Sequence, residues 1–106
     1  MNKILSALLL ALAAAGNAFA AYPDKPVTVV VPFPPGGASD QIGRVVAQKL
    51  QEKMGGSFII DNKAGATGTI GAAFVKRAPP DGYTLLVSSL GPFVIAPHLI
   101  KGVQYD

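Results

Sequence analysis

The stretch from Val27 to Asp40, which reads VTVVVPFPPGGASD, constrains the fold more than any other part of the chain. Its first five residues are all β-branched, and the run ends at Pro32, which has no N–H to donate inside a β-ladder. A continuous apolar run of this kind is typical of a strand covered on both faces, as in a parallel sheet. A glycine-containing loop follows, and Ser39 or Asp40 is placed to cap a helix by accepting from its first N–H groups.

The same succession of strand, glycine-rich loop and helix occurs a second time, and then a third strand and loop follow. We expect the second strand over 57–61, the second helix over 69–77, the third strand over 83–87, and a helical stretch over 93–99 that Pro97 interrupts. Spacing places Ile42, Val45, Val46, Leu50 and Met54 on the inward face of the first helix, and Ile70, Phe74 and Val75 on that of the second. Strand–helix–strand crossovers are right-handed and build a parallel sheet, so the fold class is α/β with a βαβαβ unit.

The three loops that follow these strands open at one edge of the sheet, where open α/β sheets bind their ligands. A helix start carries about half a positive charge, and its free N–H groups hold a carboxylate or phosphate without a lysine. For any single loop, a tight turn explains the glycines equally well. Three such loops at one edge favour a site for a small anion. The donors offered are the amides of 36–39 and 65–68 and the hydroxyls of Thr67, Thr69, Ser88 and Ser89.

Other classes of function find little support in the sequence. The formal net charge is +3, but the basic residues are scattered, whereas nucleic-acid binding requires a clustered basic stripe. There is no cysteine, which excludes disulfides and thiolate nucleophiles. No P-loop or dinucleotide fingerprint is present. The one histidine, His98, lies next to Pro97, away from any nucleophile or carboxylate pair. We therefore expect no enzyme, no cofactor and no metal site.

Residues 1–20 have the pattern of a secretory signal peptide. Lys3 precedes an apolar run from Ile4 to Ala15, and Ala18-Phe19-Ala20 has the small-residue spacing of a cleavage site. The run is shorter than the roughly 20 residues that cross a bilayer, so we expect cleavage after Ala20 rather than a membrane anchor. The mature chain, 21–106, would then not span the membrane, and an export compartment without disulfides fits a bacterial periplasm.

Several motifs resemble those of the Bug-type periplasmic solute-binding receptors, which serve tripartite tricarboxylate transporters. They follow one another in the family's order: Tyr22-Pro23-Asp24-Lys25-Pro26; Val30-Val31-Pro32-Phe33-Pro34-Pro35-Gly36-Gly37 with Asp40; Asp61-Asn62-Lys63-Ala64-Gly65-Ala66; Thr69-Ile70-Gly71-Ala72; Pro80-Asp81-Gly82-Tyr83-Thr84-Leu85-Leu86; and Gly102 to Asp106. The chain departs from the family at Lys63-Ala64, where Arg-Pro is common, at Ala96, where asparagine is frequent, and at Thr67, where glycine is common. A β-branched residue is unfavourable at Thr67 if that position has a positive φ.

The resemblance implies a type II periplasmic binding protein fold, in which two lobes close on a small carboxylate. It also implies a receptor that passes its ligand to membrane transporter subunits and performs no chemistry. The ligand-binding residues that it implies are Phe33, Pro34, Pro35, Gly36, Gly37, Ser39 and Asp40 in the first loop, Gly65, Ala66, Gly68 and Thr69 in the second, and Ser88 and Ser89 in the third.

Family members are considerably longer than this chain, so the resemblance implies that 21–106 is an incomplete N-terminal lobe. A portion this small buries a modest share of its surface and leaves sheet edges open, which predicts marginal stability and aggregation. Two alternatives remain: a non-functional truncation product, and a small secreted α/β hydrolase that uses Ser39 or Asp40. The ligand itself stays undefined, because amide donors recognise a carboxylate and not the rest of the molecule.

Overall fold

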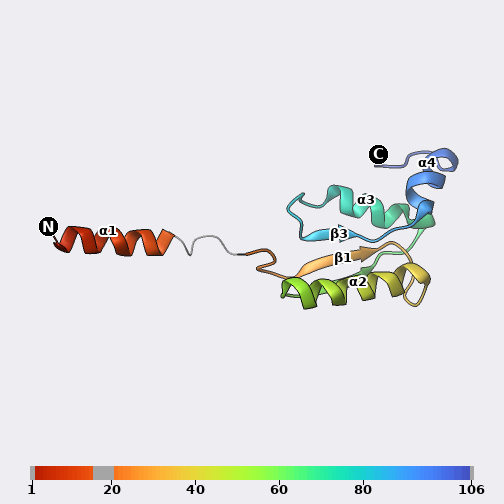
Figure 1. The fold of residues 1–106 in the computed structure, drawn as a ribbon. Coiled ribbons are helices and arrows are strands. Elements are labelled where there is room, and N and C mark those ends of the chain that lie inside the picture. The colour runs from red at the N-terminus through yellow and green to blue at the C-terminus, as the bar shows by residue number, and fades with distance from the viewer. Residues whose placement is uncertain (1, 16–20, 106) are drawn as a thin grey trace.

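The computed structural model describes residues 2–15 and 21–105, which form one long helix and an α/β body (Figure 1). The helix α1 (Asn2–Ala15) lies apart from the body, and its leucines at positions 8 and 9 are exposed. Of the helices described, none is both long and apolar enough to cross a membrane. The predicted cleavage site after Ala20 lies outside the described residues.

The body is built on a three-stranded parallel sheet in the order β2-β1-β3. Its strands are β1 (Val27–Val31), β2 (Phe58–Asn62) and β3 (Thr84–Leu86). The predicted α/β fold with a parallel sheet is therefore confirmed, and β1 has the predicted bounds. Strand β2 lies one residue later than predicted, and β3 is one residue shorter at each end.

Strand β1 is buried because it is central in the sheet and helices cover both faces. Helix α2 (Ala38–Met54) packs on one face and α3 (Thr69–Arg77) on the other (Figure 1). Val27, Val29, Val30 and Val31 are each 1% exposed or less. On the α2 side the core consists of Val27, Val29, Ala47 and Phe58. The continuous apolar run in the sequence thus predicted the central strand correctly.

The predicted inward face of α2 is wrong. Four of the five residues expected to face the sheet are exposed, namely Ile42, Val45, Val46 and Met54, whereas Leu50 is half-buried. Gly43 and Ala47 are buried in their place. The helix lies so close to β1 that a Cβ added at Gly43 would come within 2.9 Å of Val31 Cγ2, so only small residues fit at this contact.

Helix α3 departs from its predicted face for the same reason. Ile70 and Phe74 are exposed, Val75 is half-buried, and Gly71 and Ala72 form the buried surface. A Cβ added at Gly71 would lie 2.5 Å from Pro32 Cβ. Both helices therefore make their closest contacts with the sheet through glycine and alanine, and most of their longer apolar side chains are exposed.

After β3 the chain forms a helical segment made of a π-helical turn, η2 (Gly91–Ile95), and α4 (Ala96–Leu99). The predicted interruption at Pro97 is wrong. Pro97 lies in the first turn of α4, where a missing N–H is tolerated.

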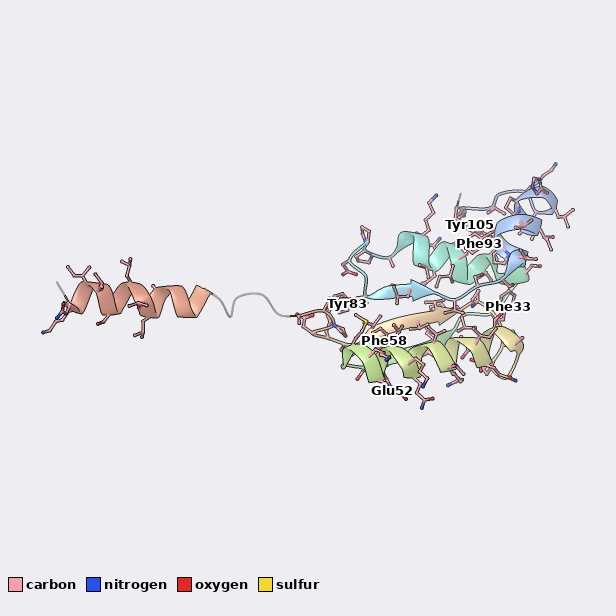
Figure 2. All side chains as sticks on the ribbon, in the orientation of Figure 1. Phe33, Glu52, Phe58, Tyr83, Phe93 and Tyr105 are labelled. Atoms are coloured by element: carbon pink, nitrogen blue, oxygen red, sulfur yellow. The ribbon has the colours of Figure 1, made fainter. Side chains whose placement is uncertain are left out.

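The segment before β1 is tied to the turn before β3, at the end of the sheet away from the three loops. The Tyr22 hydroxyl donates to the carbonyl of Gly82 at 2.5 Å, and the Tyr83 hydroxyl donates to Asp24. The rings of Tyr22 and Tyr83 are 5.1 Å apart. Figure 2 shows Tyr83 and Phe58 at this end and Phe33 at the opposite one.

The orientation of α2 predicts that substitutions on its buried and exposed faces have different effects on stability. Gly43→Ala adds a methyl group against the stiff side chain of Val31, so we expect a net loss of about 1–3 kcal/mol in the free energy of unfolding despite the better helix propensity of alanine. Ile42→Ala, on the exposed face, should change it by no more than about 0.5 kcal/mol. Urea denaturation of the exported chain measures both. A larger loss for Ile42→Ala than for Gly43→Ala would contradict the orientation.

Candidate functional site

The three loops that follow the strands leave the sheet at the same edge, as predicted. Val31 at the end of β1 is level with Asn62 at the end of β2, and Val30 is level with Leu86 of β3. Two further backbone bonds extend the pairing, from Lys63 N–H to the carbonyl of Val31 and from Val87 N–H to that of Val30, both at 2.9 Å. The parallel register therefore brings all three loops to one end of the sheet.

The first loop leads into α2 without a side-chain cap. Gly37 is the N-cap residue, with φ −75° and ψ 176°, and no side chain accepts from the helix start. The predicted capping by Ser39 or Asp40 is wrong, because both residues already lie inside the first turn. The N–H groups of Ala38, Ser39 and Asp40 have no intrahelical acceptor by their position. With residues 34–38 exposed, this helix start is open to solvent and suited to an anion.

The Asp40 side chain points into the protein, where it joins the first loop, α2 and β2. It is 3% exposed and accepts three hydrogen bonds: from Gly36 N–H at 2.9 Å, Arg44 Nε at 3.0 Å and Asn62 Nδ2 at 2.9 Å. Asn62 Nδ2 also donates to the carbonyl of Phe33 at 3.1 Å. The Gly36 amide, one of the predicted anion donors, is therefore engaged by Asp40.

These donors stabilise the ionised carboxylate. The hydrogen bond from Asn62 contributes most, followed by those from Gly36 and Arg44, and together they lower the pKa of Asp40 from 3.8 to about 2. Asp40 is thus an anion at any physiological pH, and its charge is matched by donors within the protein. A group in this state is unsuited to accept a proton near neutral pH.

The second loop contains a short left-handed turn, η1 (Ala66–Gly68). Four consecutive residues, Gly65, Ala66, Thr67 and Gly68, have positive φ angles of 129°, 48°, 58° and 87°. The left-handed region is unfavourable for a β-branched residue, so Thr67 is strained there, as its departure from glycine indicated. The Thr69 hydroxyl, a predicted ligand donor, donates to the carbonyl of Ala66 at 2.8 Å and closes the turn.

The three loops pack against one another around the ring of Phe33, which lies at the loop end of the sheet (Figure 2). A Cβ added at Gly68 would lie 3.0 Å from Phe33 Cζ and 3.1 Å from Pro92 Cγ. One added at Gly91 would lie 3.3 Å from the carbonyl oxygen of Thr67. The first, second and third loops are therefore in direct contact at positions where only glycine fits without a shift.

The third loop contributes two serines with different surroundings. Ser88 is half-buried, and its Oγ is buried without a hydrogen-bond partner among the described residues, whereas Ser89 is exposed. A buried hydroxyl without a partner is costly, so a ligand atom or a water molecule is expected beside it. Ser88 thus remains a candidate for ligand binding on physical grounds.

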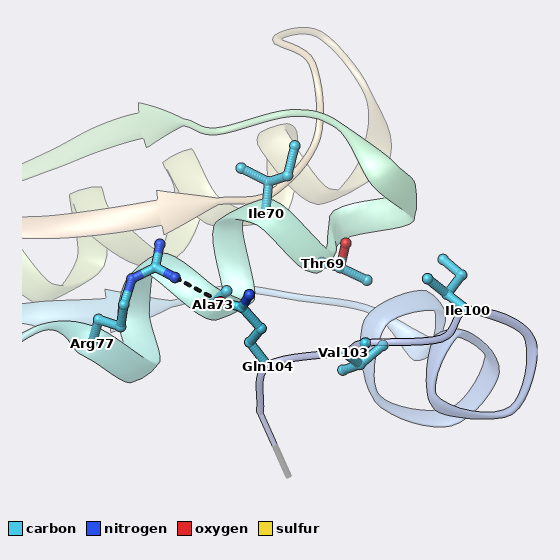
Figure 3. Close-up of a pocket in the computed structure, with 8 residues that line it drawn as sticks. Thr69, Ile70, Ala73, Arg77, Ile100, Val103 and Gln104 are labelled. Atoms are coloured by element: carbon cyan, nitrogen blue, oxygen red, sulfur yellow. Dashed lines mark hydrogen bonds between the residues drawn. The ribbon is translucent and has the colours of Figure 1, made fainter.

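A separate groove of about 260 Å³ lies between α3 and residues 100–104 (Figure 3). Arg77 Nη1 donates to Gln104 Oε1 at 3.1 Å across its end. Of the predicted site residues only Thr69 lines this groove. The groove is therefore distinct from the contact between the three loops.

Sequence reasoning placed the loops correctly but missed the residues that support them. Asn62 and Arg44, which hold Asp40, are not among the predicted site residues. Gly91 and Pro92, which complete the packing around Phe33, were not among the predicted site residues. An asparagine at the end of a strand beside two loops was the signal that could have identified Asn62, because its amide can bond to both.

Helix-start amides exposed at the loop edge of a parallel α/β sheet are an arrangement with which proteins commonly bind small anions. Residues 42–106 match the model of the family described as tripartite tricarboxylate transporter family receptor (TctC). The chain belongs to this family of solute-binding receptors.

Individual relatives agree with this assignment. The chain is 37% identical to protein BugT of Bordetella pertussis over 110 residues, which cover 99% of this chain and 34% of BugT. Among solved structures, Rhodopseudomonas palustris Rpa4515 with adipate is 39% identical with a TM-score of 0.77, covering 80% of this chain and 28% of that one. MatC from the same organism, with bound malate, is 42% identical with a TM-score of 0.59, covering 61% and 22%. The chain therefore spans about a third of BugT and less of the solved structures.

The Asp40 network predicts a specific dependence of stability on pH. Because the folded state favours the ionised carboxylate, its contribution is complete above the ordinary pKa of 3.8 and is lost as pH falls towards about 2. Asp40→Asn places an amide group against the Asn62 and Gly36 donors, so we expect a lower free energy of unfolding at pH 7. We also expect that free energy to fall less steeply than in the parent chain as pH decreases below about 4. Urea midpoints measured across this range test it, with Glu52→Gln on the exposed face of α2 as the control. Parallel pH profiles for Asp40→Asn and the parent chain would contradict the network.

The strain in the second loop predicts a stabilising substitution. Thr67→Gly relieves a left-handed β-branched residue and should raise the free energy of unfolding by about 1 kcal/mol, after the higher entropy of glycine in the unfolded chain is included. Thr69→Gly is the matched control, because φ at Thr69 is −70° and its hydroxyl closes the turn. That change should lower stability. Thermal denaturation distinguishes the two, and a loss of stability in Thr67→Gly would refute the strain.

Proposed function

We propose that the chain is the N-terminal part of a periplasmic solute-binding receptor that captures a small carboxylate for a tripartite tricarboxylate-type transporter. Residues 1–20 would direct export and be removed, and 21–106 would form part of the first lobe. The observation that carries the proposal is the packed edge of three loops, at which the free N–H groups of Ala38 and Ser39 begin a long helix. The adipate and malate bound by Rpa4515 and MatC support a carboxylate as the ligand.

The geometry favours binding over chemistry. In a hydrolase that used this edge, Asp40 would act as the base, but its carboxylate is fully engaged and its pKa is lowered to about 2. His98 is exposed on α4, beyond the third loop. We therefore propose a receptor without enzymatic activity, with transporter subunits as its macromolecular partners.

The contribution of a single amide can be tested at Ala38 without changing the fold. Ala38 is the first residue of α2, where proline is well tolerated, and the extended conformation of Gly37 suits a residue before proline. Ala38→Pro removes one N–H donor, so we expect the affinity for adipate or malate to fall about tenfold or more, as for loss of a hydrogen bond to a charged group.

Titration calorimetry and ¹⁵N NMR on the exported chain provide the measurement. Ala38→Gly retains the N–H group and serves as the matched control, and adipamide, which lacks the charge, serves as the control ligand. We expect saturable shifts at the amides of residues 37–39 with the diacids and none with adipamide. If no carboxylate produces saturable binding to the parent chain, the proposed function is wrong.

A further inference from the structure

We propose that Phe33 is a positioning residue that joins the three loops into one unit, so that donors on one loop depend on the placement of the other two. The inference rests on the proposed function, since it concerns the same ligand edge. It differs from the role implied by resemblance to the receptor family, in which Phe33 is one of the ligand contacts.

The position of the ring carries this inference. Gly68 of the second loop is so close to Phe33 that an added Cβ would lie 3.0 Å from the ring tip, Cζ. Pro92, in η2 directly after the third loop, is also close to Gly68, with its Cγ 3.1 Å from the same added Cβ. The tip of the ring is thus directed at the second and third loops, and Phe33 is only half-buried at the edge.

The backbone of Phe33 is fixed independently of its ring. Its carbonyl accepts from Asn62 Nδ2 at 3.1 Å, and the same amide group donates to Asp40 at 2.9 Å. Phe33 is therefore anchored to the end of β2 and to the start of α2. A side chain held at its base and packed at its tip transmits a displacement of the second or third loop to the first, because close-packed groups have little free volume.

Gly91 lies close to both Thr67 of the second loop and the ring of Phe33. An added Cβ there would lie 3.3 Å from the Thr67 carbonyl oxygen, 3.4 Å from Thr67 Cγ2 and 4.0 Å from Phe33 Cζ. The second and third loops thus touch each other as well as the ring. The strained φ of Thr67 is held at this contact, which explains how packing maintains an unfavourable backbone conformation.

The decisive variant is Phe33→Tyr, which adds a hydroxyl group at Cζ, the ring atom that lies nearest to Gly68 and Gly91. In the free exported chain we expect NMR amide shifts in all three loops and none in the middle of β1, β2 or β3. We also expect the affinity for adipate to fall about tenfold, since a binding constellation must be held within about 0.5 Å. Phe93→Tyr is the matched control: Phe93 is 49% exposed and packs edge-on against Tyr105 at 5.7 Å.

A second variant keeps the test decisive if Phe33→Tyr fails to fold. Gly91→Ala needs no change of backbone, because φ at Gly91 is not positive, and it inserts a methyl group between the second and third loops. We expect it to shift the amide signals of Gly36 and Gly37 in the first loop. Unchanged signals there would overturn the coupling.

The outcomes separate this inference from the proposed function. If Phe33→Tyr weakens adipate binding but leaves the free second and third loops unchanged, the ring contacts the ligand and the positioning role is wrong. The positioning role is also wrong if Phe33→Tyr shifts only the amide signals of residues next to Phe33 and binds adipate with the affinity of the parent chain. If the parent chain binds no carboxylate, the proposed function fails, whereas the loop shifts of the free variants still decide whether Phe33 couples the loops.

Discussion

The buried carboxylate of Asp40 is the interaction on which the candidate site depends. An ionised group that is 3% exposed is tolerated only when it is fully hydrogen-bonded, and here its partners come from the first loop, from α2 and from the end of β2. That requirement fixes the loop relative to the helix start. The N–H groups of Ala38 and Ser39, which follow Gly36, have no acceptor within the helix. The charge that organises the site is thus neutralised locally, so it does not oppose the binding of an external anion.

The second constraint on the structure is the close approach of helices and loops at three glycine residues. Gly43 against Val31, Gly71 against Pro32 and Gly68 against Phe33 all leave less space than a methyl group requires. These contacts set the distance of both helices from β1 and the distance between loops. The glycines therefore have a packing role at the helix contacts and, at Gly68, a conformational role as well, because its φ is 87°. Glycine thus permits close packing in the core, and at Gly68 in the loops it also permits a left-handed backbone conformation.

The strands and the position of the loops were predictable because β1 is a continuous β-branched run and because parallel crossovers leave little choice of topology. The helix faces were not. Helix α2 has two stripes of apolar or small residues, and periodicity favours the larger side chains of Ile42, Val45 and Val46 over Gly43 and Ala47. Only the distance to the strand decides between them. The Asn62–Asp40 bond was likewise out of reach, since residues 22 apart in sequence meet only through the sheet.

In the proposed receptor, this edge of the sheet would bind one end of the ligand. The amides at the start of α2 can donate to a carboxylate, but residues 34–38 are exposed to water, which weakens every charged interaction formed there. Strong binding of a small acid requires that water be excluded from the side facing away from the loops. The chain spans 34% of BugT, and its α2 carries an uncovered apolar surface at Ile42, Val45 and Val46. Under the proposed function, the described loops would contact the charged end of the ligand, whereas selectivity for the remainder of the molecule would require a surface opposite them.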